Sequence, residues 1–383
     1  IQSLLQNAMK KICIFSAVIV FLFLQKTLSA QTPKSWGVET NFYTGKILKH
    51  SSKILFDVEG LSQGFDINIK YQTYGKHKWS QYQRYPIIGV GLVYFNLGDK
   101  DVLGNAIAFL PNVSVPLLRT ERGFINFQFG TGLAYLTRFY DYIENPTNNA
   151  IGSHWNNITH VKFNGGMDIT PQWMTQVGFG VIHYSNGASQ LPNLGINIVS
   201  ASVGVKYTPD PVERKDFLWD DDFKNVPQKR WGFQTHLGLG FREFGEPGGN
   251  RYPIYNISTG AVFHFNAVNR MVFGFEGEYS PGVYHYNYHL EPNADSKELH
   301  ALARKLTFFV ADELMFGNLG VYILLGTYIE GGDRKDFDIY NKLSFRYYFP
   351  PIGKPTGQFF VAVHLKSHLS VAEYISLGAG VNF

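Results

Sequence analysis

The sequence predicts an all-β protein: a transmembrane antiparallel β-barrel of the outer-membrane type, with about 16 strands arranged as a duplicated 8+8. Aromatic residues make up 16% of the chain and glycine occurs 39 times. Only 17% of residues are charged, against roughly 25% in typical soluble domains. Apolar residues recur with a period of two over many short segments, which is the pattern of strands with one fatty face.

The first 30 residues are expected to be upstream residues and a secretory signal peptide rather than part of the fold. Lys10 and Lys11 precede the apolar run Ile12 to Leu24, and Leu28 to Ala30 provides a small-residue cleavage site. The run is shorter than the roughly 20 residues of a spanning helix. The only cysteine, Cys13, lies in this segment, so thiol chemistry is excluded for the rest.

The remainder of the chain is close to neutral, because three of the lysines behind the formal charge of +4 lie in the first 30 residues. This balance gives no indication of a nucleic-acid partner. Sixteen alternating segments follow, each bounded by Gly, Asn, Asp or Pro. We expect strands at 36–48, 61–75, 86–98, 104–119, 123–138, 158–170, 173–186, 195–207, 231–243, 252–266, 270–287, 305–316, 319–330, 336–349, 357–369 and 372–383.

The two sets of eight segments are similar in sequence. Trp36-Gly37-Val38-Glu39-Thr40 is echoed by Trp231-Gly232-Phe233-Gln234-Thr235. We therefore expect an eight-strand unit at 31–208, a polar linker at 209–230 and a second eight-strand repeat at 231–383. The linker holds Asp220, Asp221 and Asp222, which fit either a calcium site or a solvated acidic segment; we favour the second.

The last segment ends in an apolar row that closes on Phe383, as the terminal strands of bacterial outer-membrane barrels do. With both ends of the chain in the periplasm, odd-numbered strands run outward. The segment from Trp173 is the seventh strand. Its ten residues up to His183 rise roughly 24 Å at the usual barrel tilt, which is about the height of the lipid band. His183 is therefore expected at the outer-leaflet edge.

The predicted hairpin 173–207 carries the candidate chemistry. His183 and Ser185 finish the apolar row of the first strand, and Asn197 begins the apolar row of the next. A simple register places His183 opposite Asn197. Serine is a weak nucleophile until a neighbouring base takes its proton, and residues two apart on a strand share a face. A polar pair on a lipid-facing row indicates either a catalytic site or the headgroup zone.

Residues 35–208 resemble the outer-membrane lipid A 3-O-deacylases, also described as acyloxyacyl hydrolases. The resemblance rests on His183-Tyr184-Ser185-Asn186, on Pro192-Asn193 and on Gly195-Ile196-Asn197. It implies an eight-stranded barrel that hydrolyses the ester-linked acyl chain at the 3-position of lipid A.

The same resemblance assigns roles to single residues. Ser185 is the implied nucleophile, His183 the general base, and Asn193 the oxyanion stabiliser, helped by Asn186 or by backbone N–H groups. Asn197 departs from the pattern, because the family has an acid, usually Glu, at that place. An asparagine can orient an imidazole but cannot stabilise an imidazolium by charge.

The second half, read as a diverged repeat, does not duplicate this site. His364, Lys366 and His368 fall on the polar face of their segment. We expect them in the barrel interior, paired with Glu276, Glu278 or Glu313, rather than around a metal. Residues i and i+4 of a strand lie about 13 Å apart, too far to share an ion.

We therefore expect an outer-membrane esterase that acts on lipid A of lipopolysaccharide in the outer leaflet and needs no metal or cofactor. The alternative is a non-catalytic, porin-like or structural barrel. For strand closure we prefer one wide barrel, since single chains usually form one. The long linker and the self-closed family fold favour the other arrangement, two tandem eight-stranded barrels.

Overall fold

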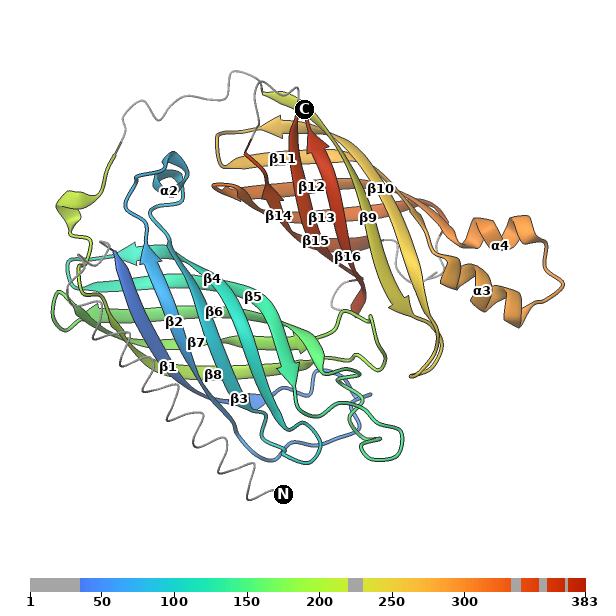
Figure 1. The fold of residues 1–383 in the computed structure, drawn as a ribbon, viewed down its shortest axis with the longest axis horizontal. Coiled ribbons are helices and arrows are strands. Elements are labelled where there is room, and N and C mark those ends of the chain that lie inside the picture. The colour runs from blue at the N-terminus through green and yellow to red at the C-terminus, as the bar shows by residue number, and fades with distance from the viewer. Residues whose placement is uncertain (1–34, 220–229, 332–338, 351–356, 369–370) are drawn as a thin grey trace.

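The structure is a computed structural model, and it describes residues 35–219, 230–331, 339–350, 357–368 and 371–383. It contains two closed antiparallel barrels of eight strands each (Figure 1). The strands of the first barrel are β1 (Trp36–Ile47), β2 (Ser62–Gln72), β3 (Ile87–Asn96), β4 (Asn105–Arg119), β5 (Gly123–Leu136), β6 (Trp155–Asp168), β7 (Trp173–Ser185) and β8 (Ile196–Tyr207). Those of the second are β9 (Trp231–Glu243), β10 (Arg251–His264), β11 (Asn269–Tyr279), β12 (Arg304–Phe316), β13 (Leu319–Gly331), β14 (Ile339–Tyr348), β15 (Gln358–His368) and β16 (Val371–Asn382).

The expectation of sixteen barrel strands is confirmed, but the preference for one wide barrel is wrong. Strand β8 returns to pair with β1, from Val38↔Tyr207 to Ile47↔Ile198. Strand β16 pairs with β9 in the same way. The first and last strands of each set of eight are thus paired along both of their edges. No free edge remains through which the two sets could merge into one ring.

The outward faces of the strands carry the apolar rows that the sequence indicated. Phe42 is 64% exposed, Phe179 61% and Leu237 62%, while their neighbours along each strand point inward. Such rows would be unfavourable in water but match a lipid environment. The alternation therefore defines which side of every strand faces lipid.

The interior of the first barrel has two parts. One half holds a charged and amide network in which Asn41 donates to Glu39 at 3.1 Å and to Asp66 at 2.9 Å, and Lys70 donates to Asn112 at 2.6 Å. The other half is an apolar core that reaches into the connections following the odd-numbered strands. Its members include Ile54, Phe56, Phe95, Leu97, Leu103, Leu136, Ile151, Ile182, Tyr184, Ile196 and Ile198.

The interior of the second barrel is packed with ion pairs. Lys366 lies 2.8 Å from Glu278 and 3.1 Å from Glu373, and Lys342 lies 2.6 Å from Glu276. The predicted inward direction of His364, Lys366 and His368 is confirmed, since each is at most 3% exposed. Their partners differ in part from the prediction.

Lys366 pairs with an expected carboxylate, Glu278. His368 lies 3.6 Å from Glu373, whereas His364 meets Ser344 at 2.6 Å and His236 at 2.8 Å. An eight-stranded barrel is narrow enough for side chains to fill it, and these contacts fill this one.

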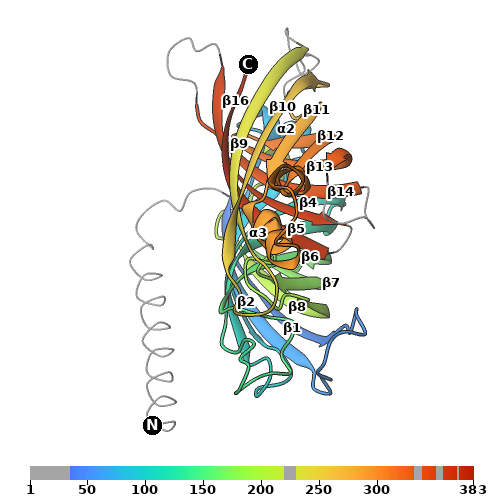
Figure 2. The ribbon, with the colours of Figure 1, turned by 90° about the vertical axis from the view of Figure 1, so that its right-hand side faces the viewer.

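The helices were not foreseen. They are α2 (Lys78–Tyr82), the short 3₁₀ turn η2 (Arg214–Asp216), α3 (Pro281–Leu290) and α4 (Ser296–Leu302). The predicted segment 270–287 overran β11 because the aromatic run after Val283 resembles a strand. Pro281 occupies the first turn of α3, where its missing N–H costs nothing. Helices α3 and α4 project from the second barrel on the side away from the first (Figures 1 and 2).

Part of the predicted linker packs against the connection between β2 and β3. The amide of Leu218 donates to the Tyr74 carbonyl at 2.8 Å, and the rings of Phe217 and Tyr85 meet at 4.8 Å. The proposed signal peptide and the cluster Asp220 to Asp222 lie outside the described residues. Within the described part of the chain, no helix has the length and apolar character needed to cross a membrane.

Removing the Glu313 carboxylate should destabilise the second barrel. Glu313 is fully buried and holds Arg270 at 2.9 Å and Arg346 at 3.4 Å. Glu313→Ala leaves two buried guanidinium groups without their anion, at a cost of about 3 kcal/mol or more. The temperature at which the folded band disappears in a gel-mobility assay should fall. Asp312→Asn, at the exposed neighbouring position, is the control, and equal midpoints for both variants would contradict this account.

Candidate active site

The candidate site lies at one end of the hairpin formed by β7 and β8. His183 is paired with Asn197 across the two strands, so the register predicted from the sequence is confirmed. The inward residues on either side, Ile182 and Tyr184, are fully buried in the apolar core of the first barrel. This packing fixes the backbone from which His183 and Ser185 project on the opposite, outward face.

The three predicted residues form a hydrogen-bonded chain. Ser185 Oγ lies 3.0 Å from His183 Nε2, and His183 Nδ1 lies 2.7 Å from Asn197 Oδ1. Because Asn197 Oδ1 only accepts, Nδ1 carries the ring proton and Nε2 can accept from the serine hydroxyl. Ser185 is only 5% exposed. The arrangement has the geometry of a nucleophile beside an oriented base.

Gly195 makes room for the imidazole. Its backbone has φ +79°, and a Cβ at this position would lie 2.8 Å from His183 Cε1. Its amide donates to the Ala150 carbonyl at 2.9 Å, which ties the beginning of β8 to the β5–β6 connection. Glycine is therefore needed at this position both for its backbone conformation and for the space beside the ring.

The two predicted oxyanion residues have different surroundings. Asn193 Oδ1 accepts from the backbone amide of Asn186 at 2.9 Å, which places Asn193 beside the residue that follows Ser185. The side-chain NH₂ of Asn186 donates to Ser153 Oγ at 3.0 Å and to the Gln190 carbonyl at 2.8 Å. Both of its protons are engaged in holding the loop, so Asn186 does not offer them to a substrate.

His50 joins the chain of hydrogen bonds, although sequence reasoning missed it. It lies in the β1–β2 connection, and its Nδ1 is 2.9 Å from Asn197 Nδ2. Its other ring nitrogen, Nε2, is 3.1 Å from the carbonyl oxygen of Leu194. His50 and Asn197 are 147 positions apart in the chain, and no local pattern around His50 indicates the contact. Barrel closure between β1 and β8 brings them together.

The second barrel contacts the loop that follows Ser185. Glu243 accepts a hydrogen bond from the Leu191 amide, and Arg251 donates to the side chain of Gln190. A Cβ on Gly187 would collide with Ile375 of β16. These contacts lie at the end of each barrel from which the connections after odd-numbered strands extend, and we call this end the loop rim.

The barrels also meet at the opposite, turn rim, formed by connections that follow even-numbered strands. Gln83 donates to the Met315 carbonyl at 3.3 Å, and the rings of Trp79 and Phe316 lie 6.2 Å apart. Between the rims, Phe129 and Phe345 stack at 5.9 Å. Loop rim meets loop rim and turn rim meets turn rim, so the two barrels point the same way, as a shared membrane requires.

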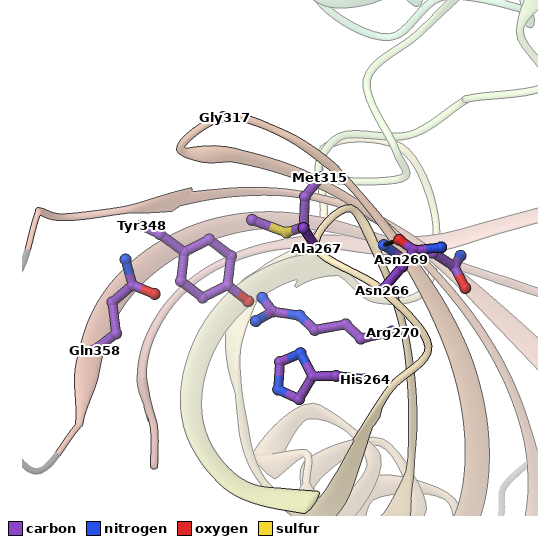
Figure 3. Close-up of a pocket in the computed structure, with 9 residues that line it drawn as sticks. All are labelled: His264, Asn266, Ala267, Asn269, Arg270, Met315, Gly317, Tyr348 and Gln358. Carbon is purple, nitrogen blue, oxygen red and sulfur yellow. Dashed lines mark hydrogen bonds between the residues drawn. The ribbon is translucent and has the colours of Figure 1, made fainter. Parts of the chain in front are cut away.

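A separate cavity of about 210 Å³ lies in the second barrel (Figure 3). It is lined by His264, Asn266, Ala267, Asn269, Arg270, Met315, Gly317, Tyr348 and Gln358. These residues belong to the turn rim, whereas Ser185 lies at the loop rim of the other barrel. Across the described ranges, no group of three His, Cys, Asp or Glu residues is placed to hold a metal ion.

The sequence matches two family models, one over most of the first barrel and one over the second. Residues 63–206 match "Lipid A 3-O-deacylase (PagL)", and residues 231–383 match "Acyloxyacyl hydrolase, C-terminal domain". The chain belongs to the PagL lipid A 3-O-deacylase family. This is a family of ester hydrolases, and the chain is a β-barrel protein of that family.

Solved structures similar to this PagL-family chain include an outer-membrane enzyme PagL, 16% identical, which covers 43% of this chain and 97% of its own, with a TM-score of 0.29. A porin of Rh. blastica is 12% identical over 91% of this chain and 99% of its own, with a TM-score of 0.20. No curated protein matches the sequence. The fold assignment rests on the strand pairing, and the family assignment on the two family models.

We expect the Glu243 carboxylate to protect the Leu191 amide from hydrogen exchange with solvent. Its carboxylate accepts from this amide and, at 2.8 Å, from Gly248 N. Loss of a hydrogen bond to a charged group is worth about 1.5–3 kcal/mol, so Glu243→Ala should speed exchange of the Leu191 amide at least about tenfold.

Hydrogen exchange followed by mass spectrometry of a peptide spanning 187–195 measures this rate. Glu246→Gln is the matched control, because Glu246 is an exposed acid in the same β9–β10 connection. If exchange in the Glu243 variant equals that of the control, the carboxylate does not hold the loop.

Proposed function

We propose that this protein hydrolyses an ester-linked acyl chain of lipid A by Ser-His catalysis on the outward face of its first barrel. The observation that carries the proposal is the Ser185 to His183 to Asn197 hydrogen-bonded chain, at 3.0 and 2.7 Å. It stands at the end of a lipid-facing row of the first barrel. The family match supplies the substrate class.

The reaction begins with the hydroxyl of Ser185. Its oxygen attacks the ester carbonyl while its proton passes to His183 Nε2. The tetrahedral intermediate then expels the sugar oxygen, which takes the proton back from His183, and the acyl group remains on Ser185. Water, deprotonated by the same imidazole, releases the fatty acid and restores the serine.

Asn193 is our candidate for the oxyanion donor. Its Oδ1 is used by the Asn186 amide, which leaves its NH₂ group as the hydrogen-bond donor for the developing negative charge. Asn186, proposed from the sequence as a helper, has a supporting role instead because its own NH₂ binds Ser153 and Gln190. It fixes the loop that presents Asn193.

The porin-like alternative is disfavoured by the barrel interiors. Side chains fill both, with an apolar core in one half of the first barrel and with ion pairs and apolar clusters in the second. A water-filled channel needs a wider ring of strands than eight. The interior contacts therefore favour function on the outer surface.

Ser185→Ala should abolish hydrolysis, with a fall of at least about a thousandfold, because the nucleophile is lost. Free fatty acid released from purified lipopolysaccharide in detergent gives the rate, and mass spectrometry of lipid A from cells gives the acylation state. Ser202→Ala, an inward serine of the same hairpin, is the matched control and should retain activity. Identical lipid A in wild type, Ser185→Ala and a strain lacking the gene would end the hydrolase proposal.

Gly195→Ala should also lower the rate, since the new Cβ would push against His183 Cε1 and the φ of +79° suits only glycine. A displacement of about 1 Å in a catalytic group can cost on the order of a hundredfold. The same fatty-acid assay measures the effect, with folding checked by gel mobility. Full activity in a folded Gly195→Ala protein would show that the imidazole position is not critical.

A further inference from the structure

The side chain of Asn197 can face His183 in two chemically different orientations, whereas an acid in its place could not. A carboxylate presents two equivalent acceptor oxygens, whereas an amide presents an acceptor at one end and a donor at the other. If the NH₂ of Asn197 faced His183, Nδ1 would have to accept and the ring proton would sit on Nε2. His183 could then no longer take the proton of Ser185.

We propose that His50 is a positioning residue that sets the direction of the Ser185–His183–Asn197 chain. The inference rests on the proposed function and deepens it. His50 Nε2 faces the Leu194 carbonyl at 3.1 Å, and a carbonyl oxygen only accepts, so Nε2 carries the proton. His50 Nδ1 is then an acceptor, and it faces the NH₂ of Asn197 at 2.9 Å.

Every hydrogen bond in the resulting chain runs the same way. Ser185 donates to His183, His183 to Asn197, Asn197 to His50, and His50 to the Leu194 carbonyl. Reversing the Asn197 amide would require an Nδ1–H on His50 and would leave its bare Nε2 against a carbonyl oxygen. The backbone oxygen of Leu194 thus fixes, through His50 and Asn197, which nitrogen of His183 is free to act as base.

One contact favours the opposite tautomer. The carbonyl oxygen of Leu48 lies 3.3 Å from His50 Nδ1 and would accept from an Nδ1–H. Both contacts of the Nε2–H form are shorter, at 2.9 and 3.1 Å. Leu48 also anchors the strand next to the site, because its amide donates to the Asn197 carbonyl at 2.8 Å. The β1–β2 connection is therefore held where His50 can reach Asn197.

A double-mutant cycle between His50 and Asn197 tests the inference. His50→Ala should lower kcat about tenfold with little change in KM, because the amide loses its orienting partner while lipid binding is untouched. In Asn197→Asp, the same His50 change should cost less than about twofold, since either carboxylate oxygen can accept from His183. His50→Asn keeps an acceptor near the Nδ1 position and should restore most of the rate.

The outcomes separate this inference from the proposed function. His50 is exposed, so its removal should leave the barrel folded, which gel mobility checks. An equal loss from His50→Ala in both backgrounds, or no loss in either, overturns the positioning role while an inactive Ser185→Ala still upholds the hydrolase. If Ser185→Ala is fully active, the hydrolase proposal fails first. A loss of kcat that occurs only when residue 197 is asparagine, and that His50→Asn reverses, supports the inference.

Discussion

Backbone hydrogen bonding in lipid is the constraint on which the rest of this structure depends. A strand in a bilayer has no water to satisfy its N–H and C=O groups, so each sheet must close on itself. Here closure occurs twice, between β8 and β1 and between β16 and β9. Eight strands give a narrow ring, and a narrow ring must be filled by side chains. Buried polar networks and outward apolar rows both follow from this geometry.

The two interiors are filled differently, and the difference bears on function. The second barrel is filled by paired Lys, Arg and Glu side chains and by apolar clusters, and the candidate site lies on the first barrel. In the first barrel, an apolar core lies directly behind the hairpin that carries His183 and Ser185. Tyr184, between these two residues, is fully buried in that core. Side chains on a strand packed in this way are held more precisely than side chains on a loop.

The loop after Ser185 depends on both barrels. Within the first barrel, Asn186 and Gly195 bind it to the β5–β6 connection through Ser153 and Ala150. From the second barrel, Glu243 and Arg251 contact it directly. The C-terminal domain thus touches the segment that carries Asn193. This gives the second barrel a physical connection to the site.

The sequence determined where the strands lie, which side of each strand faces lipid, and that His183 pairs with Asn197. It could do so because the period-two pattern and the turn residues are local properties. Tertiary structure decided the closure into two rings, since edge pairing between β1 and β8 spans residues far apart in the chain. It also decided the place of His50, which only that closure brings to Asn197. The partners of His364 and the helical turn after Ser280 likewise depended on packing that no local pattern encodes.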